Sequence, residues 1–476
     1  MHFRKTKIVC TIGPACENQL EKMIAAGMDV ARFNMSHGTH EDHLHRLKLL
    51  RAAAEKAGKR IAVVADIQGP KIRVGIFPNG GIELREGELI NLVAGRGEGG
   101  AMPQGKNIYI NYPRLLETLA QHKLVYFSDG LLEVKVEKIE KDHAVARVVT
   151  GGTLSDLKGV SIPNARLDQP TFGGKDWKDV EWAVANDVDY IAQSFVRTAK
   201  DVTKLRKLLQ YYNGEKTKII AKIEDATGLE NIEAIIAEAD AVMVARGDLG
   251  VQIPFEDVPR AQKTIIAKCG AAGKPVITAT QMLESMTASP SPTRAEVSDV
   301  ANAILDGSDA VMLSGETAFG KYPVRAVEAM AKIAAHVEQR LLQYSRQNNY
   351  CPPSKNPIPR AIASAVCATA ERISATAIAA FTETGSTAFL ISSLRPRTSI
   401  IAVTPSEKTA RQLALCWGTQ TLVVKEPRNA DEAAQYASRA LLENKLVAKN
   451  DLVIIAAGLP FGGPRNTNFI KIVRAQ

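Results

Sequence analysis

The feature that most constrains the fold is a repeated alternation of short apolar runs with stretches of helical spacing. The apolar runs begin near residues 8, 30, 61, 190, 218, 241, 275 and 310. Between them, stretches such as NQLEKMIAAG and LENIEAIIAEAD carry apolar residues at helical intervals. Nearly continuous apolar runs are typical of strands that are buried on both faces of a parallel sheet. Eight such strand-helix units predict an α/β fold, the (β/α)8 TIM barrel.

An insertion is predicted between the third and fourth strands. Those two runs start about 130 residues apart, whereas the other neighbouring runs start roughly 20 to 35 residues apart. Segments such as LLEVKVEKIEKDHAVARVV alternate apolar and polar residues with little helical period. We therefore expect residues 70–170 to form a small all-β domain, a β-barrel that lies beside the active face as a lid.

A third domain is expected near the C-terminus. The stretch CPPSKNPIPR follows the last barrel helix, and its proline density marks a boundary. Five further apolar runs then alternate with helical stretches, which indicates a compact α/β sheet. The expected domains are the catalytic barrel (1–69 and 171–348), the insert (70–170) and a C-terminal α/β regulatory domain (349–476).

Composition excludes several classes of protein. Lys and Arg number 60 against 51 Asp and Glu, a net charge of +9, but the charges are interspersed without the polybasic run that favours nucleic acid. The six cysteines form no C-x-x-C pair, which indicates neither a disulfide framework nor a zinc site. No apolar run is long enough to cross a bilayer or to form a signal peptide core. We expect a soluble, cytoplasmic protein without nucleic-acid or membrane partners.

Polar residues gather where the predicted strands end. The C-terminal strand ends of a parallel barrel carry the chemistry, and here they read RFNMSHG, DIQG, KIE, RGD, ATQM and SGET. Lys222 and Glu224 are two residues apart, so both emerge on one face of their strand. Asp248 follows the next strand, and two carboxylates are the hard oxygen ligands that Mg²⁺ prefers. A structural Lys-Glu ion pair is the alternative interpretation.

Two arginines complete a cationic set. Arg32 and Arg73 lie at or just past two further strand ends, and a guanidinium group is suited to hold phosphoryl oxygens. Either arginine alone could be a surface residue. Phosphoryl transfer mainly requires alignment and neutralisation of spread negative charge. Together with Lys222 and the two carboxylates, these residues indicate phosphoryl transfer.

Longer segments resemble the signature stretches of the pyruvate kinase family. They are, in order, CTIGPA, NMSHG, KIE, VARGDLG, ITATQMLESM and PTRAEVSDVANAILDGSDAVMLSGETAFGKYP. The expected insert and C-terminal domain resemble that family's layout, so the resemblance covers essentially all 476 residues. It implies transfer of the phosphoryl group of phosphoenolpyruvate to ADP, giving pyruvate and ATP, the final step of glycolysis. It also implies a homotetramer.

The resemblance implies a role for each matched residue. Lys222 matches the lysine that neutralises the phosphoryl group in flight, and Glu224 and Asp248 match the ligands of Mg²⁺ or Mn²⁺. Thr280 matches the threonine that organises a water for enolate protonation. The expected catalytic residues are Lys222, Thr280, Arg32, Arg73, Ser314 and Glu316. The expected substrate-binding residues are Arg32, Lys222, Gly247, Asp248 and Thr280, and those for the nucleotide are Asn34, His37, Arg73 and Lys158.

One departure from the family concerns K⁺. The resemblance implies that Asn34, Ser36, Asp66 and Ile67 occupy the positions that hold this ion in K⁺-requiring members. Those members resemble DTKGPEIRT where this chain reads DIQGPKIRV, so Lys71 replaces a glutamate. A lysine ammonium is a compact unit charge that could take over the role of K⁺. We expect the K⁺-independent, lysine-containing bacterial type, which uses Mg²⁺ alone.

The C-terminal domain contains a candidate effector site. FTETGSTAF leads from a strand through a Gly turn into a helix, whose first backbone amides suit a phosphate. By resemblance, the effector phosphate loop comprises Thr382, Thr384, Gly385, Ser386 and Thr387, and GLPFGGPRNTN is the loop that closes on the effector. An ordinary capped helix is the alternative. Glu383 stands where fructose 1,6-bisphosphate responders often have lysine, which favours a sugar monophosphate or AMP.

Two other function classes fit part of this sequence pattern. Mg²⁺-dependent lyases that act on pyruvate enolates also use carboxylates at barrel ends, but they lack the insert and the C-terminal domain. A non-catalytic effector-binding protein could keep the fold, yet every matched catalytic position is occupied here. Pyruvate formation that depends on ADP distinguishes these classes.

Overall fold

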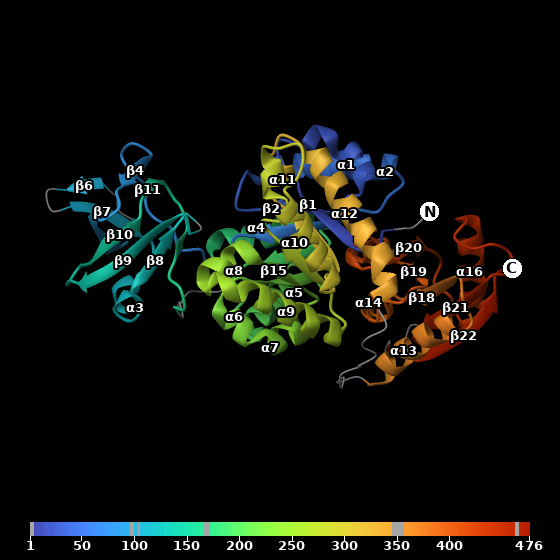
Figure 1. Ribbon diagram of the computed structural model, residues 1–476. Coiled ribbons are helices and arrows are strands. Elements are labelled where there is room, and N and C mark those ends of the chain that lie inside the picture. Colours follow the sequence, from blue (N-terminus) through green and yellow to red (C-terminus); the bar gives the residue numbers. More distant parts are fainter. Residues whose placement is uncertain are drawn as a thin grey trace.

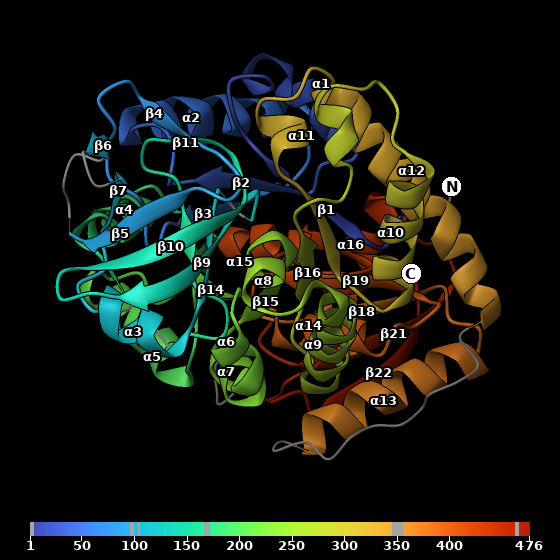
Figure 2. The same cartoon turned by 60° about the vertical axis from the view of Figure 1, so that its left-hand side comes forward.

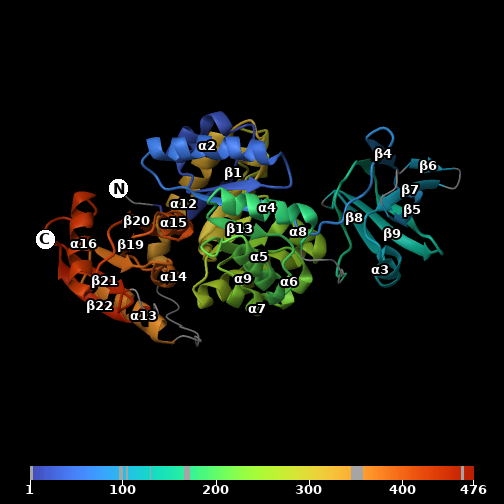
Figure 3. The same ribbon diagram turned by 180° about the vertical axis from the view of Figure 1, so that it is seen from behind.

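The computed structural model describes residues 4–95, 100–102, 105–128, 130–165, 172–344, 357–461 and 466–476. It has three parts, with the insert and the C-terminal sheet on opposite sides of a central barrel (Figures 1 and 3). The expected domain boundaries at 170/171 and 348/349 lie outside the described residues.

Eight parallel strands close into the predicted barrel, in the order β1-β17-β16-β15-β14-β13-β3-β2. Each apolar run that the sequence singled out as a barrel strand forms one of them. Their bounds are β1 Lys7–Thr11, β2 Val30–Asn34, β3 Ala62–Ile67, β13 Tyr190–Gln193, β14 Lys218–Ile223, β15 Ala241–Ala245, β16 Val276–Ala279 and β17 Ala310–Leu313.

Alternation along each strand separates two apolar cores. Val9 and Ile220 pack inside the barrel, whereas their neighbours Ile8 and Ala221 pack toward the helices. Because successive side chains point to opposite faces of a strand, Lys222 shares the inner face with Ile220. The parity of β14 therefore directs Lys222 to the inside of the barrel.

Helices surround the barrel and connect its strands. Thr39 and Thr293 begin two of them with capping boxes, in which the threonine oxygen accepts the backbone N–H of Asp42 or Glu296. The helices of this part are α1 Leu20–Ala26, α2 His40–Lys56, α4 Gly174–Ala185, α5 Ala199–Tyr211, α6 Ala226–Glu230, α7 Ile232–Glu238, α8 Arg246–Gln252, α9 Val258–Ala272, α10 Arg294–Leu305, α11 Gly315–Ala318 and α12 Pro323–Tyr344. Short 3-10 turns are η1 Glu17–Gln19, η2 Phe255–Asp257 and η3 Glu284–Thr287.

The insert between β3 and α4 is mostly β-structure. Its strands are β4 Gly81–Leu84, β5 Leu89–Ala94, β6 Gly100–Met102, β7 Gly105–Ile110, β8 Leu124–Phe127, β9 Leu132–Ile139, β10 His143–Thr150, β11 Gly152–Ser155 and β12 Val160–Ser161. Seven pair in the order β12-β8-β9-β10-β5-β7-β6, and β11 pairs with β4. Isolated bridges pair Arg73 with Gly159, next to β12, and Val74 with Ile110 of β7. Residues 73–74 therefore link the regions near the two ends of the strand order, and the sheet is curled. The helix α3, Leu115–Gln121, was not expected, because seven residues are too few to give a helical period.

The C-terminal part is the expected α/β sheet, with strand order β20-β19-β18-β21-β22. Only its edge pairing, β21 with β22, is antiparallel among the described strands. The strands are β18 Ala377–Phe381, β19 Ser399–Thr404, β20 Thr419–Val423, β21 Leu452–Ala457 and β22 Phe469–Arg474. The helical segments are α13 Pro357–Arg372, α14 Ser386–Ser393, α15 Glu407–Gln412, η4 Leu413–Leu415 and α16 Ala430–Glu443.

This part covers the N-terminal ends of the barrel strands. Leu415 joins the apolar cluster inside the barrel, and the Tyr190 hydroxyl donates to the Gln412 carbonyl at 2.7 Å. Figure 2, in which the insert comes forward, shows the C-terminal strands behind the barrel. The opposite end of the barrel, toward the insert, is left for the site. Among the described residues, no helix combines the length and apolarity needed to span a membrane.

Candidate active site

A buried carboxylate at the end of β3 gathers two cations from neighbouring strands. Asp66, 2% exposed, accepts from Arg32 Nε at 2.6 Å and from Lys222 Nζ at 3.1 Å. Burial alone would raise the pKa of Asp66, but Arg32 and Lys222 outweigh it and lower the pKa. The carboxylate therefore stays ionised and fixes a guanidinium and an ammonium group at one place in the barrel mouth.

Lys222 is held by three oxygen acceptors. Besides Asp66, its amine contacts Glu224 Oε1 at 2.9 Å and Ser194 Oγ at 2.7 Å. Burial would lower the pKa of Lys222, but the charges of Asp66 and Glu224 outweigh it and raise the pKa. The Ser194 hydroxyl donates in turn to the Ile67 carbonyl at 2.8 Å. Ser194 was missed from sequence, although it is also a polar residue at a strand end.

Two acidic residues in this mouth form a candidate metal centre. Glu224 Oε2 accepts the Phe195 N–H at 2.7 Å. Burial raises the pKa of Glu224 to about 7, with Lys222 opposing the rise and the Asp248 charge adding to it. A divalent cation would offset both the burial of Glu224 and its repulsion by the partly exposed Asp248. Mg²⁺ bound there would take its other ligands from water and substrate.

Lys71 reaches this pair from the insert side. Its amine lies 3.3 Å from Asp248 Oδ1, and the side chain is 23% exposed. The turn that presents Lys71 is anchored by Asp176, whose carboxylate accepts the N–H groups of Gly69 at 3.1 Å and Gly173 at 2.7 Å. Asp176 thus ties together the chain on both sides of the insert. Sequence reasoning missed this residue, because it lies inside an ordinary helical stretch.

Thr280 follows β16 in a strained conformation. Its φ of 69° is unfavourable for a β-branched residue. Thr280 Oγ1 accepts the Gly247 N–H at 2.8 Å, and Arg246, paired with Asp299 at 2.7 Å, donates to the Thr280 carbonyl at 2.8 Å. Such strain persists only where surrounding contacts maintain it, and it concentrates at functional sites.

Ser314 and Glu316 follow β17. The fully buried Glu316 carboxylate accepts the N–H groups of Ser314 at 2.7 Å and Leu283 at 3.0 Å, and burial raises its pKa. Ser314 Oγ is buried without a hydrogen-bond partner among the described residues. A buried hydroxyl in this state is suited to bond a ligand or a water.

The expected nucleotide side of the site is strongly cationic. The pKa of His37 is lowered by partial burial and then by the charges of Arg73, Arg32, Lys158 and Lys71. These side chains come from β2, from the turn after β3 and from the insert. The structure therefore brings the predicted cations toward one region that suits anionic oxygens.

Other predicted residues are engaged with the backbone. Asn34 Oδ1 accepts the Ser36 N–H at 3.2 Å, and the Ile67 carbonyl accepts from Ser194. Arg73 Nη1 donates to the Leu157 carbonyl at 2.9 Å, which connects it to the insert.

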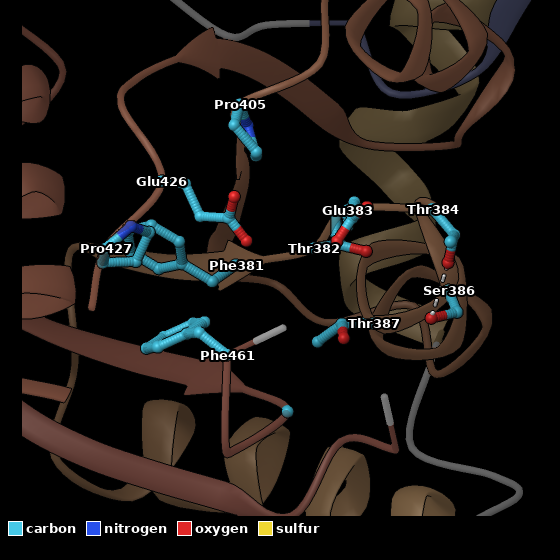
Figure 4. A pocket seen from close by; sticks show the side chains of 11 residues that line it. Phe381, Thr382, Glu383, Thr384, Ser386, Thr387, Pro405, Glu426, Pro427 and Phe461 are labelled. Carbon is cyan, nitrogen blue, oxygen red and sulfur yellow. Dashed lines mark hydrogen bonds between the residues drawn. The ribbon is translucent and has the colours of Figure 1, made fainter. Parts of the chain in front are cut away.

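The predicted effector residues lie together in the C-terminal part (Figure 4). Gly385, at φ 89°, precedes α14 and donates its N–H to Thr382 Oγ1 at 2.9 Å. Threonine and serine hydroxyls of this turn line a pocket with Glu426 and Phe461. Glu426 was not predicted, and it adds a second carboxylate to that of Glu383. The loop 458–468, expected to close on the effector, lies partly outside the described residues.

Comparison with known proteins assigns the family. The family model "Pyruvate kinase, barrel domain" matches residues 3–327, and "Pyruvate kinase, alpha/beta domain" matches residues 360–473. A pyruvate kinase of Geobacillus stearothermophilus is 44% identical over 473 residues, covering 98% of this chain and 80% of the relative. One from Staphylococcus aureus (strain MRSA252) is 42% identical over 474 residues, covering 99% and 80%.

A solved structure agrees. The crystal structure of a pyruvate kinase from Cryptosporidium parvum superposes with a TM-score of 0.88 at 38% identity, covering 99% of this chain and 96% of that chain. With both family models matched and relatives above 40% identity over nearly all of this chain, the chain belongs to the pyruvate kinase family.

Proposed function

We propose that the cluster around Lys222 is the place where the phosphoryl group passes from phosphoenolpyruvate to ADP. As a member of its family the chain is a phosphotransferase (EC 2.7.1.40) that forms pyruvate and ATP. The family membership favours this activity over the two alternatives, a lyase and a non-catalytic effector-binding protein. The observation that carries the location is the ammonium group of Lys222, held between Asp66 and Glu224 in the barrel mouth.

The residues at the different strand ends have different proposed roles. Arg32 and Lys222 neutralise the oxygens of the moving group, because cations fixed in a buried site stabilise spread negative charge. Thr280 orients the water that protonates the enolate, and its fixed turn supports this role. Glu316 holds the turn that carries Ser314, whose buried hydroxyl would bond that water.

The nucleotide lies on the insert side. Arg73 and Lys158 bind its phosphates, with Asn34 and His37 beside them. The proximity of both cations to His37, whose pKa is lowered by burial and then by these charges among others, supports the placement. The insert, residues 70–170, acts as a lid over the barrel formed by 1–69 and 171–348. We also propose a homotetramer, as the resemblance to the family implies, and sedimentation of the purified chain tests it.

Glu224 and Asp248 are proposed as the protein ligands of Mg²⁺ or Mn²⁺. Glu224 and Asp248 would hold the ion, which would supply positive charge to neutralise phosphoryl oxygens. The repulsion between the two carboxylates and the burial of Glu224 support the assignment.

Asp248→Asn is expected to weaken Mn²⁺ binding by at least about tenfold, since it removes one of two charged ligands. Electron paramagnetic resonance titration of the whole chain with Mn²⁺ alone measures this without turnover. Asp257→Asn is the matched control, because Asp257 forms a surface ion pair with Arg260. Equal Mn²⁺ affinity in Asp248→Asn and the wild type would refute the assignment.

We propose that the chain is of the K⁺-independent, lysine-containing type. Lys71 supplies a fixed positive charge beside Asp248, where a K⁺ ion would add a second cation. The oxygens expected to hold K⁺ also have protein partners, since Asp66 pairs with two cations and the Ile67 carbonyl accepts from Ser194.

The pocket at α14 is proposed to bind a phosphorylated effector that regulates the enzyme. The turn Thr382–Thr387 offers hydroxyls and the first backbone amides of a helix. Glu383 and Glu426 in the same pocket oppose a second phosphate, which favours a sugar monophosphate or AMP over a bisphosphate. Titration of AMP, ribose 5-phosphate and fructose 1,6-bisphosphate at subsaturating phosphoenolpyruvate tests this. No response to any of them would refute it.

A further inference from the structure

We propose that Lys218 couples the effector loop, residues 382–387, to the catalytic end of β14. Effector binding then changes the affinity for phosphoenolpyruvate through this side chain. The inference rests on the proposed effector function of the loop and names the residue that transmits its signal.

Lys218 lies directly against the effector loop, although it belongs to the barrel. Its amine donates to the Thr384 carbonyl at 2.9 Å and lies 4.6 Å from the centroid of the Phe389 ring on α14. A Cβ atom placed on Gly385 would be 3.3 Å from the same amine. Thr384 also lines the effector pocket (Figure 4). One residue of the loop therefore faces the ligand site and bonds the barrel.

The contacts of Lys218 are those of a cation. Burial lowers its pKa to about 8, with the charge of Asp240 opposing the shift, so the amine is mostly protonated at neutral pH. A charged donor strengthens the bond to the carbonyl, and the ring of Phe389 attracts the same charge. Loss of this charge would weaken both contacts together.

Strand β14 connects this contact with the active site. Lys218 is its first residue, and Lys222 lies four residues on, about 13 Å along a strand. Residues two apart share a face, so Lys218, Ile220 and Lys222 are in line. Parallel partners β13 and β15 flank the strand on both sides. A strand held in this way transmits a shift of its first residue as a rigid element.

Packing supports the same route. Ile220, between the two lysines, lies in the apolar cluster that also contains Leu415 of the C-terminal part. Other cross-domain pairs involve other segments: Lys408 and Arg411 of α15 pair with Asp187 and Asp189, and Arg395 pairs with Asp309. Lys218 differs because it bonds the loop on which the effector would act.

Coupling requires that the effector bind two arrangements of the effector loop with different affinities. An effector that binds one arrangement more tightly shifts the position of the Thr384 carbonyl and, with it, Lys218. Coupling is reciprocal, so phosphoenolpyruvate must change effector affinity by the same factor. Removing the ammonium group should abolish this factor while leaving both binding sites in place.

The test compares Lys218→Met and Lys218→Arg with the wild type. Lys274→Met is the matched control, because Lys274 is a half-buried lysine whose amine also donates to a backbone carbonyl, that of Ala239 at 2.6 Å, within the barrel. AMP and ribose 5-phosphate serve as probes. The half-saturating phosphoenolpyruvate concentration is measured with and without each probe, and calorimetry gives probe affinity with and without phosphoenolpyruvate in the absence of ADP.

In the wild type and Lys274→Met, the active probe should lower the half-saturating concentration by about fivefold or more. In Lys218→Met the change should be less than about twofold, with probe affinity in the absence of phosphoenolpyruvate within about threefold of the wild type. Lys218→Arg, which keeps the charge, should restore at least part of the response.

Two results would overturn the coupling role alone: an undiminished response in Lys218→Met, or loss of probe binding itself in that variant. A wild type that responds to neither probe would instead refute the preference for a monophosphate effector, and the coupling role tested with these probes.

Discussion

Lys222→Met is expected to lower kcat by about 10²- to 10³-fold, the cost of removing one fixed charge from a buried transition state. The lysine is the cation between Asp66 and Glu224, so its loss also leaves two carboxylates facing the phosphoryl group. Repulsion would then add to the missing attraction. The measurement is kcat for ADP-dependent pyruvate formation at saturating substrates.

Control variants separate this effect from damage to the fold. Lys218→Met makes the same change on the same face of the same strand, at the end away from the barrel mouth, and should keep kcat. Lys222→Arg retains a cation and should lose less activity than Lys222→Met. Circular dichroism reports whether each variant is folded. A folded Lys222→Met with kcat within about tenfold of the wild type would contradict the catalytic role.

Lys71→Glu is expected to create a requirement for K⁺. The substitution replaces the ammonium group beside Asp248 with a carboxylate, which adds a third negative charge to those of Asp248 and Glu224. Without K⁺ the rate should fall by at least about tenfold, and added K⁺ should recover most of it, because a free cation can then occupy the vacated charge position. Initial rates in tetramethylammonium buffer, with and without K⁺, provide the measurement.

The comparison needs constant ionic strength, since salt alone screens surface charges. Lys71→Gln is the companion variant, because it removes the cation without adding an anion and should show a smaller K⁺ effect. If Lys71→Glu were equally active with and without K⁺, the lysine would not occupy the role of the ion.

The barrel could be predicted because its strands are buried on both faces. Continuous apolar runs give a strong signal, and the polar residues that end them, such as Lys222 and Asp66, fall at the carboxyl ends of parallel strands. The parity of β14 alone placed Lys222 and Glu224 on a common face.

Contacts between distant segments could not be predicted. Lys71 contacts Asp248, which lies 177 positions away in the sequence, and Ser194 bridges Lys222 to the Ile67 carbonyl. Only the closed barrel brings these residues together. The contacts of Asp176 could not be predicted for the same reason. Its carboxylate oxygens accept the N–H groups of two glycines that the insert separates by more than a hundred residues. Lys218 gave no signal either, because a lysine at the start of a strand is ordinary until the effector loop is seen against it.

The most direct test of the central claim is the initial rate of pyruvate formation by the wild-type chain. The buffer contains Mg²⁺ and tetramethylammonium, with ADP and K⁺ each present or omitted. The account predicts a rate that requires ADP and changes by less than about twofold on addition of K⁺. Pyruvate formed without ADP, or activation by K⁺ of about tenfold or more, would contradict it.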